Sequence, residues 1–275
     1  MNASPSMTRH FNGKIVVLTG AASGIGRAMA GALAAAGATV HALDSNAAGL
    51  ESLSLANPGA GEIHPYTLDV SDRASYADVI RKVMDDSSRI DFLFNNAGVT
   101  QLGEAQNIPF ERWQRLLDIN LMGVVHGVAL VYPIMIAQGG GHIVNTASIA
   151  GGTGYATAAA YTASKAAILE LTRSLRSEAK AYGVRVSVAC PGYVNSSLFN
   201  QESIVGANRD AVLNDLPVRM MTPAEAAGHL LRGVAKGRGS IIFPFSAAFL
   251  WTISNWAPVF IGPFHRKFLR VFQTS

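Results

Sequence analysis

The sequence predicts a doubly wound α/β protein, with a parallel sheet of about seven strands and helices on both faces. Seven short apolar runs bounded by turn residues recur along the chain, and their composition is typical of buried strands. Longer segments of helical composition separate these runs. Alternating strands and helices imply right-handed crossovers, and therefore a ligand crevice at the carboxyl ends of the strands.

Two long segments define the best marked helices. The helix over residues 27–36 closes on Gly37, and the helix over residues 157–181 closes on Gly183. Glycine adopts the left-handed conformation that ends a helix without steric cost. The expected strands cover residues 14–18, 39–43, 63–68, 91–94, 142–146, 184–189 and 240–243.

Composition favours a single folded domain. Hydrophobic residues make up 49% of the 275 residues and charged residues 15%, which suits a compact α/β protein and excludes a disordered chain. No repeat, low-complexity tract or long Pro/Gly/Ser linker divides the chain.

The charge pattern argues against nucleic acid as a partner. The formal net charge is +4, but the basic residues before residue 236 are scattered rather than gathered in runs. Cys190 is the only cysteine, so no intrachain disulfide forms, and residues 1–12 lack the apolar core of a signal peptide. We therefore expect a cytoplasmic protein, and no metal site is predicted.

A glycine-rich loop follows the first expected strand. Residues 19–26 are Thr-Gly-Ala-Ala-Ser-Gly-Ile-Gly and lead into an alanine-rich helix. Glycines permit a tight turn and let backbone N–H groups approach a pyrophosphate, whose charge the positive end of the following helix also favours. Turns of this composition are common, so the strand before the loop and the helix after it carry the prediction of phosphate binding.

The spacing of Gly20, Gly24 and Gly26 resembles the glycine motif of the short-chain dehydrogenase/reductase family. The resemblance implies a Rossmann fold and a residue at the end of the second strand that selects the coenzyme. Asp44 stands there, and a carboxylate accepts hydrogen bonds from ribose hydroxyls but repels a 2′-phosphate. No basic residue adjoins Asp44, and Ser23 stands where phosphate-preferring relatives often carry a cation, so NAD is expected rather than NADP. Capping of the next helix by Asp44 remains an alternative.

Three more segments resemble coenzyme contacts of this family. Asp69-Val70 matches the adenine contact, residues 95–98 (Asn-Asn-Ala-Gly) match the supporting loop, and Ser196 ends a Pro-Gly segment at the position of a common threonine. Each alone is ordinary turn chemistry. The implied coenzyme contacts are Gly20, Ser23, Gly24, Ile25, Gly26, Asp44, Asp69, Val70, Asn96, Ala97, Gly98, Tyr161, Lys165, Pro191, Gly192, Val194 and Ser196.

Tyr161 and Lys165 carry the predicted chemistry. They lie four residues apart in an expected helix, so they share one face one turn apart. Hydride transfer at a carbon that bears oxygen needs a proton transfer at that oxygen. A free tyrosine has a pKa of about 10, too high for a base near neutral pH, and a neighbouring ammonium lowers that pKa. Tyr161 is therefore the expected acid and base, and Lys165 its activator.

Ser148 and Asn120 complete the pattern. Ser148 follows the fifth expected strand, where its hydroxyl can hold the substrate oxygen. Asn120 matches the family residue that holds a water linking Lys165 to solvent. Each residue has a structural alternative as a surface pair, a turn cap or a satisfied buried amide. In this order and beside the glycine loop, the four resemble the catalytic tetrad of the family.

The resemblance covers about residues 14–243 and implies an NAD(H)-dependent oxidoreductase of secondary alcohols and ketones, assembled as a homodimer or homotetramer. A non-catalytic NAD-binding sensor or scaffold on the same fold is the alternative, because fold alone does not prove activity. Cys190 is expected to be a small buried hydrophobe rather than a nucleophile.

The implied domain plan has three parts. A flexible N-terminus is expected over residues 1–12, one catalytic domain over residues 13–244, and an apolar tail over residues 245–275. Within the domain, residues 195–222 match the place of the family's substrate lid. Apolar residues dominate this lid, which favours a lipophilic substrate over a sugar.

The tail departs from the family pattern. Residues 240–264 include no charged residue, but three prolines interrupt this stretch, so a membrane span is not expected. A helix with Phe249, Trp251 and Trp256, followed by basic residues at 266, 267 and 270, can lie on a membrane surface or cover a hydrophobic substrate. It can equally pack in the interior or against a partner subunit. The sequence leaves these alternatives open.

Overall fold

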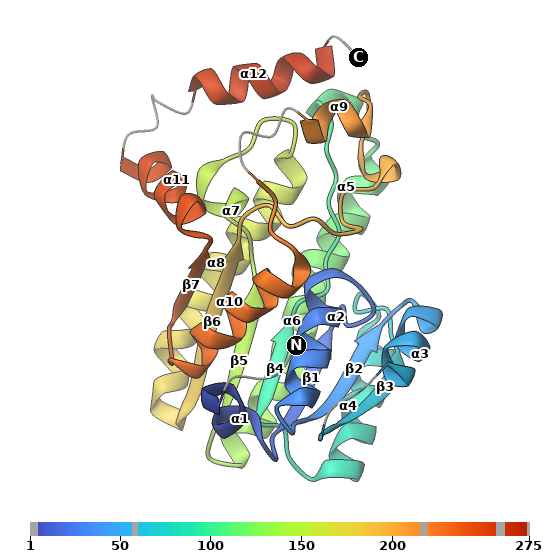
Figure 1. Ribbon diagram of the computed structural model, residues 1–275, viewed down its shortest axis with the longest axis vertical. Coiled ribbons are helices and arrows are strands. Elements are labelled where there is room, and N and C mark those ends of the chain that lie inside the picture. Colours follow the sequence, from blue (N-terminus) through green and yellow to red (C-terminus); the bar gives the residue numbers. More distant parts are fainter. Residues whose placement is uncertain (1–4, 57–59, 215–218, 257–261, 274–275) are drawn as a thin grey trace.

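One parallel sheet of seven strands organises the chain (Figure 1). The computed structural model describes residues 5–56, 60–214, 219–256 and 262–273. The strand order is β3-β2-β1-β4-β5-β6-β7, and every pair is parallel. The strands are β1 Ile15–Thr19, β2 Thr39–Asp44, β3 Glu62–Thr67, β4 Phe92–Asn95, β5 Gly141–Thr146, β6 Val184–Pro191 and β7 Ser240–Phe243. The predicted doubly wound fold is confirmed. Its strand order reverses between β1 and β4, where such folds place their ligand.

Helices cover both faces of this sheet (Figure 1). Apolar side chains of α2 (Gly24–Ala35) and α10 (Pro223–Ala235) fill the core on one face. Those of α4 (Arg73–Ser87), α6 (Gly123–Ala137) and α8 (Ala159–Ala179) fill the core on the other. The remaining helices are α1 Pro5–Phe11, α3 Ala47–Leu55, α5 Phe110–Leu117, α7 Ala150–Thr153, α9 Arg209–Asn214, α11 Phe245–Trp256 and α12 Gly262–Gln273.

The N-terminal segment is better ordered than the sequence suggested. Residues 5–11 form α1, and its Met7 and Phe11 side chains are buried in the same core as α10. The Phe11 ring also packs against Phe92 of β4, with ring centroids 5.1 Å apart. The expectation of a flexible segment over residues 1–12 is therefore wrong for residues 5–11. Apolar burial fixes this helix although it has only 7 residues.

The edge strand β3 differs from the buried strand expected there. It pairs only with β2, and each of its residues is exposed or half-buried. Pro65 lies within it, which an edge strand tolerates because one side of its backbone forms no sheet hydrogen bonds. The expected run was apolar enough for a strand but did not distinguish the edge of the sheet from its centre.

A long apolar helical run packs on the face of the sheet that α4 and α8 also cover. Residues Phe110–Ala137 are, among the described residues, the one helical run with the length and composition of a membrane span. Its Leu116, Val131 and Met135 side chains are buried against the domain. Between α5 and α6 the run widens into a π-helical turn, Asp118–Met122, which carries Asn120. Such turns commonly occur at functional sites.

The last two helices lie at the carboxyl-end side of the sheet (Figure 1). Helix α11 follows β7 and contacts α7, and α12 lies over α9. Phe272 of α12 is 6% exposed and joins a cluster with Leu102, Ile204 and Val212. The tail is therefore attached to the domain at both helices.

Candidate active site

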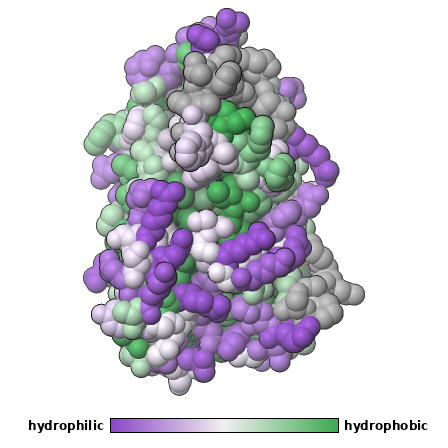
Figure 2. All heavy atoms as spheres, turned by 90° about the vertical axis from the view of Figure 1, so that its left-hand side faces the viewer, coloured by the Kyte–Doolittle hydropathy of each residue, from purple (hydrophilic) through white to green (hydrophobic). Residues whose placement is uncertain are grey.

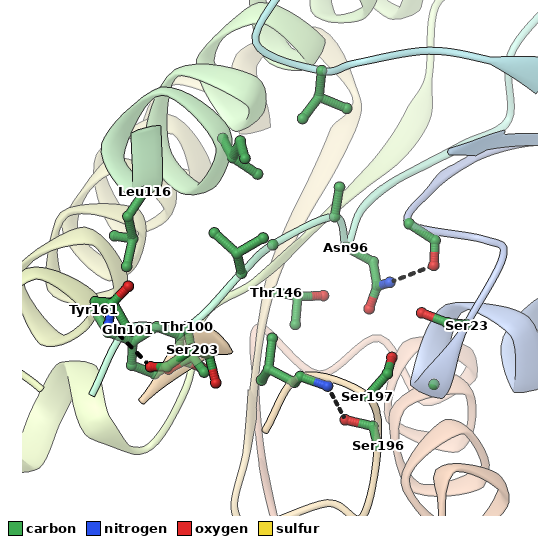
Figure 3. Close-up of a pocket in the computed structure, with 18 of the residues that line it drawn as sticks. Ser23, Asn96, Thr100, Gln101, Leu116, Thr146, Tyr161, Ser196, Ser197 and Ser203 are labelled. Carbon is green, nitrogen blue, oxygen red and sulfur yellow. Dashed lines mark hydrogen bonds between the residues drawn. The ribbon is translucent and has the colours of Figure 1, made fainter. Parts of the chain in front are cut away.

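A cleft of about 750 Å³ opens at the carboxyl ends of the strands. Figure 3 shows its two ends, with Ser23 and Asn96 on one side, Tyr161 on the other and Thr146 between them. Fourteen of the predicted coenzyme contacts line it: Gly20, Ser23, Gly24, Ile25, Asp44, Asp69, Val70, Asn96, Ala97, Gly98, Tyr161, Lys165, Pro191 and Ser196. Its volume suits an extended ligand the size of a dinucleotide.

The glycine loop is packed too tightly for side chains. A Cβ added at Gly26 would lie 1.8 Å from the backbone oxygen of Gly20, so Gly26 sits behind the turn and does not line the cleft. Gly24 has a φ of +51°, a region that favours glycine. Ser23 is the N-cap of α2, yet its hydroxyl makes no capping hydrogen bond. The start of α2 thus faces the cleft with the geometry that binds phosphate elsewhere.

Asp44 joins the cleft to the glycine loop. Its Oδ2 accepts a hydrogen bond from the backbone N–H of Ala22 and its Oδ1 accepts one from Asn46, both at 2.9 Å. The alternative that Asp44 caps the next helix is wrong, because Asn46 is the N-cap of α3 and accepts from Gly49 N. Each carboxylate oxygen keeps a further lone pair for a ligand.

Asp69 is held in place by an ion pair that the sequence did not indicate. Its Oδ2 lies 2.8 Å from Arg115 Nη2, and its Oδ1 accepts hydrogen bonds from the backbone and hydroxyl of Ser71. Burial alone would raise the pKa of Asp69, but the hydrogen bonds from Ser71 and Arg115 outweigh it and lower that pKa to about 2. Asp69 is therefore ionised at neutral pH.

Thr19 fixes the loop that follows β4. Its Oγ1 accepts hydrogen bonds from the backbone N–H groups of Asn96 and Ala97, both at 3.0 Å. The Asn96 side chain donates in return to the carbonyl of Thr19 at 3.2 Å. A Cβ at Gly20 would lie 2.8 Å from the Cα of Ala97, so the two loops touch. The predicted supporting loop thus positions the glycine loop directly.

Tyr161 and Lys165 project from α8 as expected, one turn apart. Lys165 is 4% exposed, and its Nζ donates to the carbonyl of Thr146 at 3.0 Å and lies 5.7 Å from the centroid of the Tyr161 ring. Burial lowers the pKa of Lys165 to about 8. Burial also raises the pKa of Tyr161, and a hydrogen bond with Ser148 opposes that rise. The pKa of Tyr161 in the coenzyme-free protein is therefore raised, and not lowered as the sequence predicted.

Ser148 contacts Tyr161, and Asn120 lies near Lys165. Ser148 is 8% exposed at the end of the segment that follows β5, and its hydroxyl accepts from Ala150 N at 3.2 Å. Asn120 is fully buried behind the cleft. Its side chain accepts from Val99 N at 2.8 Å and donates to Val99 O at 2.9 Å. Gly98 lies between Asn120 and Lys165, because a Cβ added there would be 3.1 Å from Asn120 Oδ1 and 3.4 Å from Lys165 Nζ.

A second, apolar pocket of about 100 Å³ adjoins the cleft at Tyr161. Tyr161, Thr100 and Leu198 line both cavities. Gly192 and Val194, predicted as coenzyme contacts, line only this second pocket. Its walls also include Ser148, Ile149, Ala150, Leu102, Tyr155, Ala158, Tyr193, Phe199, Val212 and Leu213.

Thr100 and Gln101 are site residues that the sequence did not single out. Thr100 Oγ1 is buried and has no hydrogen-bond partner among the described residues, although it lines both cavities. Tyr155 and Tyr193 share a hydrogen bond across the apolar pocket. Gln101 donates to Ser203 O of the lid. No local pattern marks Thr100 or Gln101, and Ser203, the lid partner of Gln101, lies 102 positions away along the chain.

The remaining predictions concern metal and cysteine chemistry. No cluster of metal-ligating side chains occurs within the described ranges. Cys190 is buried, and burial raises the pKa of its thiol to about 12. A thiol with that pKa holds its proton at neutral pH and is not a nucleophile.

Comparison with known proteins agrees with this geometry. The chain matches the short chain dehydrogenase family model over residues 14–204. The 3-oxoacyl-[acyl-carrier-protein] reductase of Thermotoga maritima is 36% identical over 223 residues, which cover 80% of this chain and 90% of that protein. D-threitol dehydrogenase of Mycolicibacterium smegmatis is 37% identical over 219 residues, or 79% and 84% of the two chains.

A solved structure supports the same assignment. A short-chain dehydrogenase/reductase from Burkholderia phymatum, in complex with NAD, superposes with a TM-score of 0.79 at 28% identity, covering 88% of this chain and 92% of that one. The fold and the cleft thus define the class, an α/β oxidoreductase that binds a dinucleotide. More particularly, the chain belongs to the short-chain dehydrogenase/reductase family. It is an NAD(P)-dependent enzyme that acts on the CH-OH group of donors or the matching carbonyl of a small-molecule substrate.

Proposed function

We propose that this protein is an NAD(H)-dependent oxidoreductase that interconverts a lipophilic secondary alcohol and its ketone. One observation carries the proposal: the side chain of Tyr161 lines both the dinucleotide cleft and the apolar pocket. A proton donor at this junction can reach the oxygen of a substrate whose reacting carbon faces the coenzyme.

The preference for NAD rests on the end of β2. Asp44 lines the cleft, and its neighbours Ser45 and Ser23 offer hydroxyls rather than cations. Arg27, the nearest cation in sequence, donates to backbone carbonyls of Ala22 and Gly49 and does not line the cleft. A 2′-phosphate beside Asp44 would therefore meet an uncompensated negative charge.

The residues of the tetrad have distinct parts in this proposal. The bound nicotinamide coenzyme supplies or accepts the hydride. Ser148 orients the substrate oxygen by a hydrogen bond, and the Tyr161 phenol gives that oxygen its proton in reduction or takes it in oxidation. The Lys165 ammonium stabilises the phenolate that results. Asn120 holds the backbone of Val99, and so keeps Gly98 close against Lys165.

The character of the substrate follows from the second pocket. Leucine, phenylalanine, valine and isoleucine side chains line it, and its polar lining residues include Tyr161 and Ser148. Apolar walls favour an apolar ligand, because burying its surface removes that surface from water. A volume of about 100 Å³ holds only a small group, so a larger ligand requires the lid over residues 195–222 to move outward.

The proposed setting is the cytoplasm, where the single free, buried cysteine Cys190 meets a reducing environment. We further propose assembly as a homodimer or homotetramer through the helix of Tyr161. The 3-oxoacyl-[acyl-carrier-protein] reductase and D-threitol dehydrogenase differ in their named substrates. The relatives therefore do not identify the substrate of this protein or the direction of its reaction.

A coenzyme and substrate panel tests the proposal. NADH and NADPH oxidation, and the reverse reactions, are followed by absorbance with matched sets of lipophilic and polar ketones and alcohols. The expected result is turnover with NAD(H), slower turnover with NADP(H), and higher kcat/KM for the lipophilic set. Coenzyme binding without turnover of any member would instead favour a non-catalytic NAD-binding sensor, and faster turnover with polyols would refute the lipophilic substrate.

A further inference from the structure

Helix α11 has one face fixed to the domain. Ala247 is 5% exposed, and Trp251 packs directly on Gly152, where an added Cβ would lie 2.5 Å from the indole ring. Gly152 belongs to α7, the short helix that follows Ser148. This face of α11 is therefore seated on the segment that carries an active-site residue.

The opposite face of α11 is aromatic and turned outward. Phe245, Phe249 and Trp256 are 86%, 60% and 87% exposed. Positions i, i+4 and i+11 fall on one side of a helix with 3.6 residues per turn, so these rings form a single stripe. Figure 2, which views the side of the molecule that carries α11, shows hydrophobic side chains gathered over its middle and upper part. A group of exposed aromatic side chains on one face of a folded protein marks an interaction surface.

The charged side chains of the same segment all carry positive charge. Residues 240–275 contain three basic residues and no acidic one. Two of the basic residues, Arg266 and Arg270, have exposed side chains one turn apart on α12. The tail thus combines exposed aromatic rings with positive charge, and has no acidic side chain that would oppose an anionic partner.

We propose that the aromatic face of α11, together with Arg266 and Arg270, docks on the surface of an anionic lipid bilayer. Tryptophan and phenylalanine are favoured at the boundary between headgroups and acyl chains, and basic residues bind anionic headgroups electrostatically. A second copy of the chain fits this surface less well. A two-fold interface brings the same patch against itself, which here opposes cations to cations.

Docking on lipid would place the apolar pocket beside the bilayer. Phe272 of α12 packs with Leu102, Ala158 and Val212, three residues that line this pocket. A lipophilic substrate dissolved in the membrane would then reach the active site without crossing water. This consequence rests on the proposed function, whereas the docking itself does not.

Vesicle binding tests the docking surface. Purified full-length protein is sedimented with vesicles of equal parts phosphatidylglycerol and phosphatidylcholine, and with phosphatidylcholine alone. The test variant combines Phe245→Ser, Phe249→Ser and Trp256→Ser. Its matched control combines Leu55→Ser, Phe110→Ser and Tyr182→Ser, three exposed side chains outside the tail. Circular dichroism melting shows whether both variants remain folded.

We expect wild type and the control to bind the mixed vesicles equally, and the tail variant to bind at least about tenfold more weakly. A second variant, Arg266→Gln with Arg270→Gln, leaves the rings in place and should lose about fivefold per arginine, as should wild type at high salt. Absence of vesicle binding by wild type, or equal binding by the tail variant, would overturn the proposal.

Two further readouts separate lipid from other partners. Sedimentation velocity of the same variants reports assembly, and a tail variant that dissociates an oligomer without changing vesicle binding assigns the face to a second copy and overturns lipid docking. Turnover of a water-soluble substrate should stay within about twofold of wild type in the tail variant, since none of the three rings lines either cavity. Loss of this turnover with intact vesicle binding would show that the face serves the active site instead, and would also refute docking.

Discussion

At the scale of single residues, Asp44 has an observed structural role and a proposed role in coenzyme selection. Its two carboxylate oxygens accept backbone hydrogen bonds from Ala22 and Asn46, and its side chain also lines the cleft. The residue type and its place at the end of β2 were predicted from the sequence. The bond to Ala22 was not, because it joins two loops whose approach depends on the register of β1 against β2.

Substitution of Asp44 by Asn separates these two parts. Asparagine keeps one carbonyl acceptor and removes the negative charge, so we expect the ratio of kcat/KM for NAD over NADP to fall by about tenfold or more. The measurement is steady-state kinetics with both coenzymes. If both values of kcat/KM fall together and their ratio is unchanged, Asp44 stabilises the glycine loop but does not select the coenzyme.

Lys165 is a buried ammonium group, and its burial lowers the free energy of unfolding by a measurable amount. Its pKa is lowered to about 8, so the folded protein binds fewer protons than the unfolded chain between about pH 8 and pH 10.5. The cost of burying the ammonium is therefore full below pH 8 and fades as the pH rises towards 10.5. Lys165→Met keeps the packing, and we expect it to raise the free energy of unfolding at pH 7 by on the order of 1 to 3 kcal/mol while abolishing turnover.

Urea unfolding of the coenzyme-free protein at neutral and alkaline pH checks this expectation. The stability advantage of the methionine variant should shrink as the pH approaches 10.5. A variant less stable than wild type at both pH values would show that the Lys165 hydrogen bond to Thr146 outweighs the cost of burial.

At the scale of elements, the loop between β1 and α2 is the most sterically constrained part of the site. Its glycines could be picked out from the sequence, because the need for glycine is local to this loop. The reason differs for each position. Gly24 has a positive φ, whereas at Gly26 the carbonyl of Gly20 lies too close to leave room for a side chain.

Gly26→Ala tests that close approach against a control on the same helix. Its methyl group would lie 1.8 Å from the Gly20 oxygen, so the loop must shift, and we expect weaker coenzyme binding together with a loss of about 1 to 3 kcal/mol in stability. Gly31→Ala meets no atom within 4 Å and should stabilise the protein by up to about 1 kcal/mol. Calorimetric titration with NADH and thermal melting measure both effects. Normal NADH binding by the Gly26 variant would contradict the account.

The elements that the sequence missed share a cause. Helix α1 is too short to show a period, and only Met7 and Phe11 reveal its burial. The π-helical turn at Asn120 depends on its bonds to Val99, a residue 21 positions away. The sequence left open whether the aromatic residues of the tail are buried or exposed. In the structure Trp251 packs on Gly152, whereas Phe249 is exposed to solvent. Contacts of this kind are set by tertiary packing rather than by local pattern.

At the scale of the whole molecule, two buried histidines link stability to pH. Burial is the main cause that lowers the pKa of His142 to about 3 and that of His41 to about 4. The unfolded chain therefore binds more protons than the folded protein below about pH 6.5, and stability falls as the pH drops from there towards 4. Each histidine contributes up to about 1.4 kcal/mol per pH unit in this window.

His142→Asn tests this linkage. The asparagine does not titrate and can keep a hydrogen bond near Ser187, the present partner of His142 Nε2 at 2.7 Å. We expect the free energy of unfolding to decline less steeply between about pH 6.5 and pH 4 than in wild type. Urea denaturation at a series of pH values measures the slope. An unchanged slope would mean that His142 does not carry the acid sensitivity.

The proposed function requires Tyr161 to move the proton at the junction of the two cavities. Substitution of Tyr161 by Phe removes only the phenolic oxygen, and Tyr182→Phe, at an exposed tyrosine outside the site, is the matched control. The most direct measurement is single-turnover hydride transfer in both variants, with NADH affinity determined on the same samples. We expect Tyr161→Phe to bind NADH within a few-fold of wild type and to react about 10² to 10⁴ times more slowly, while the control is unchanged. Hydride transfer at the wild-type rate in Tyr161→Phe would contradict the account.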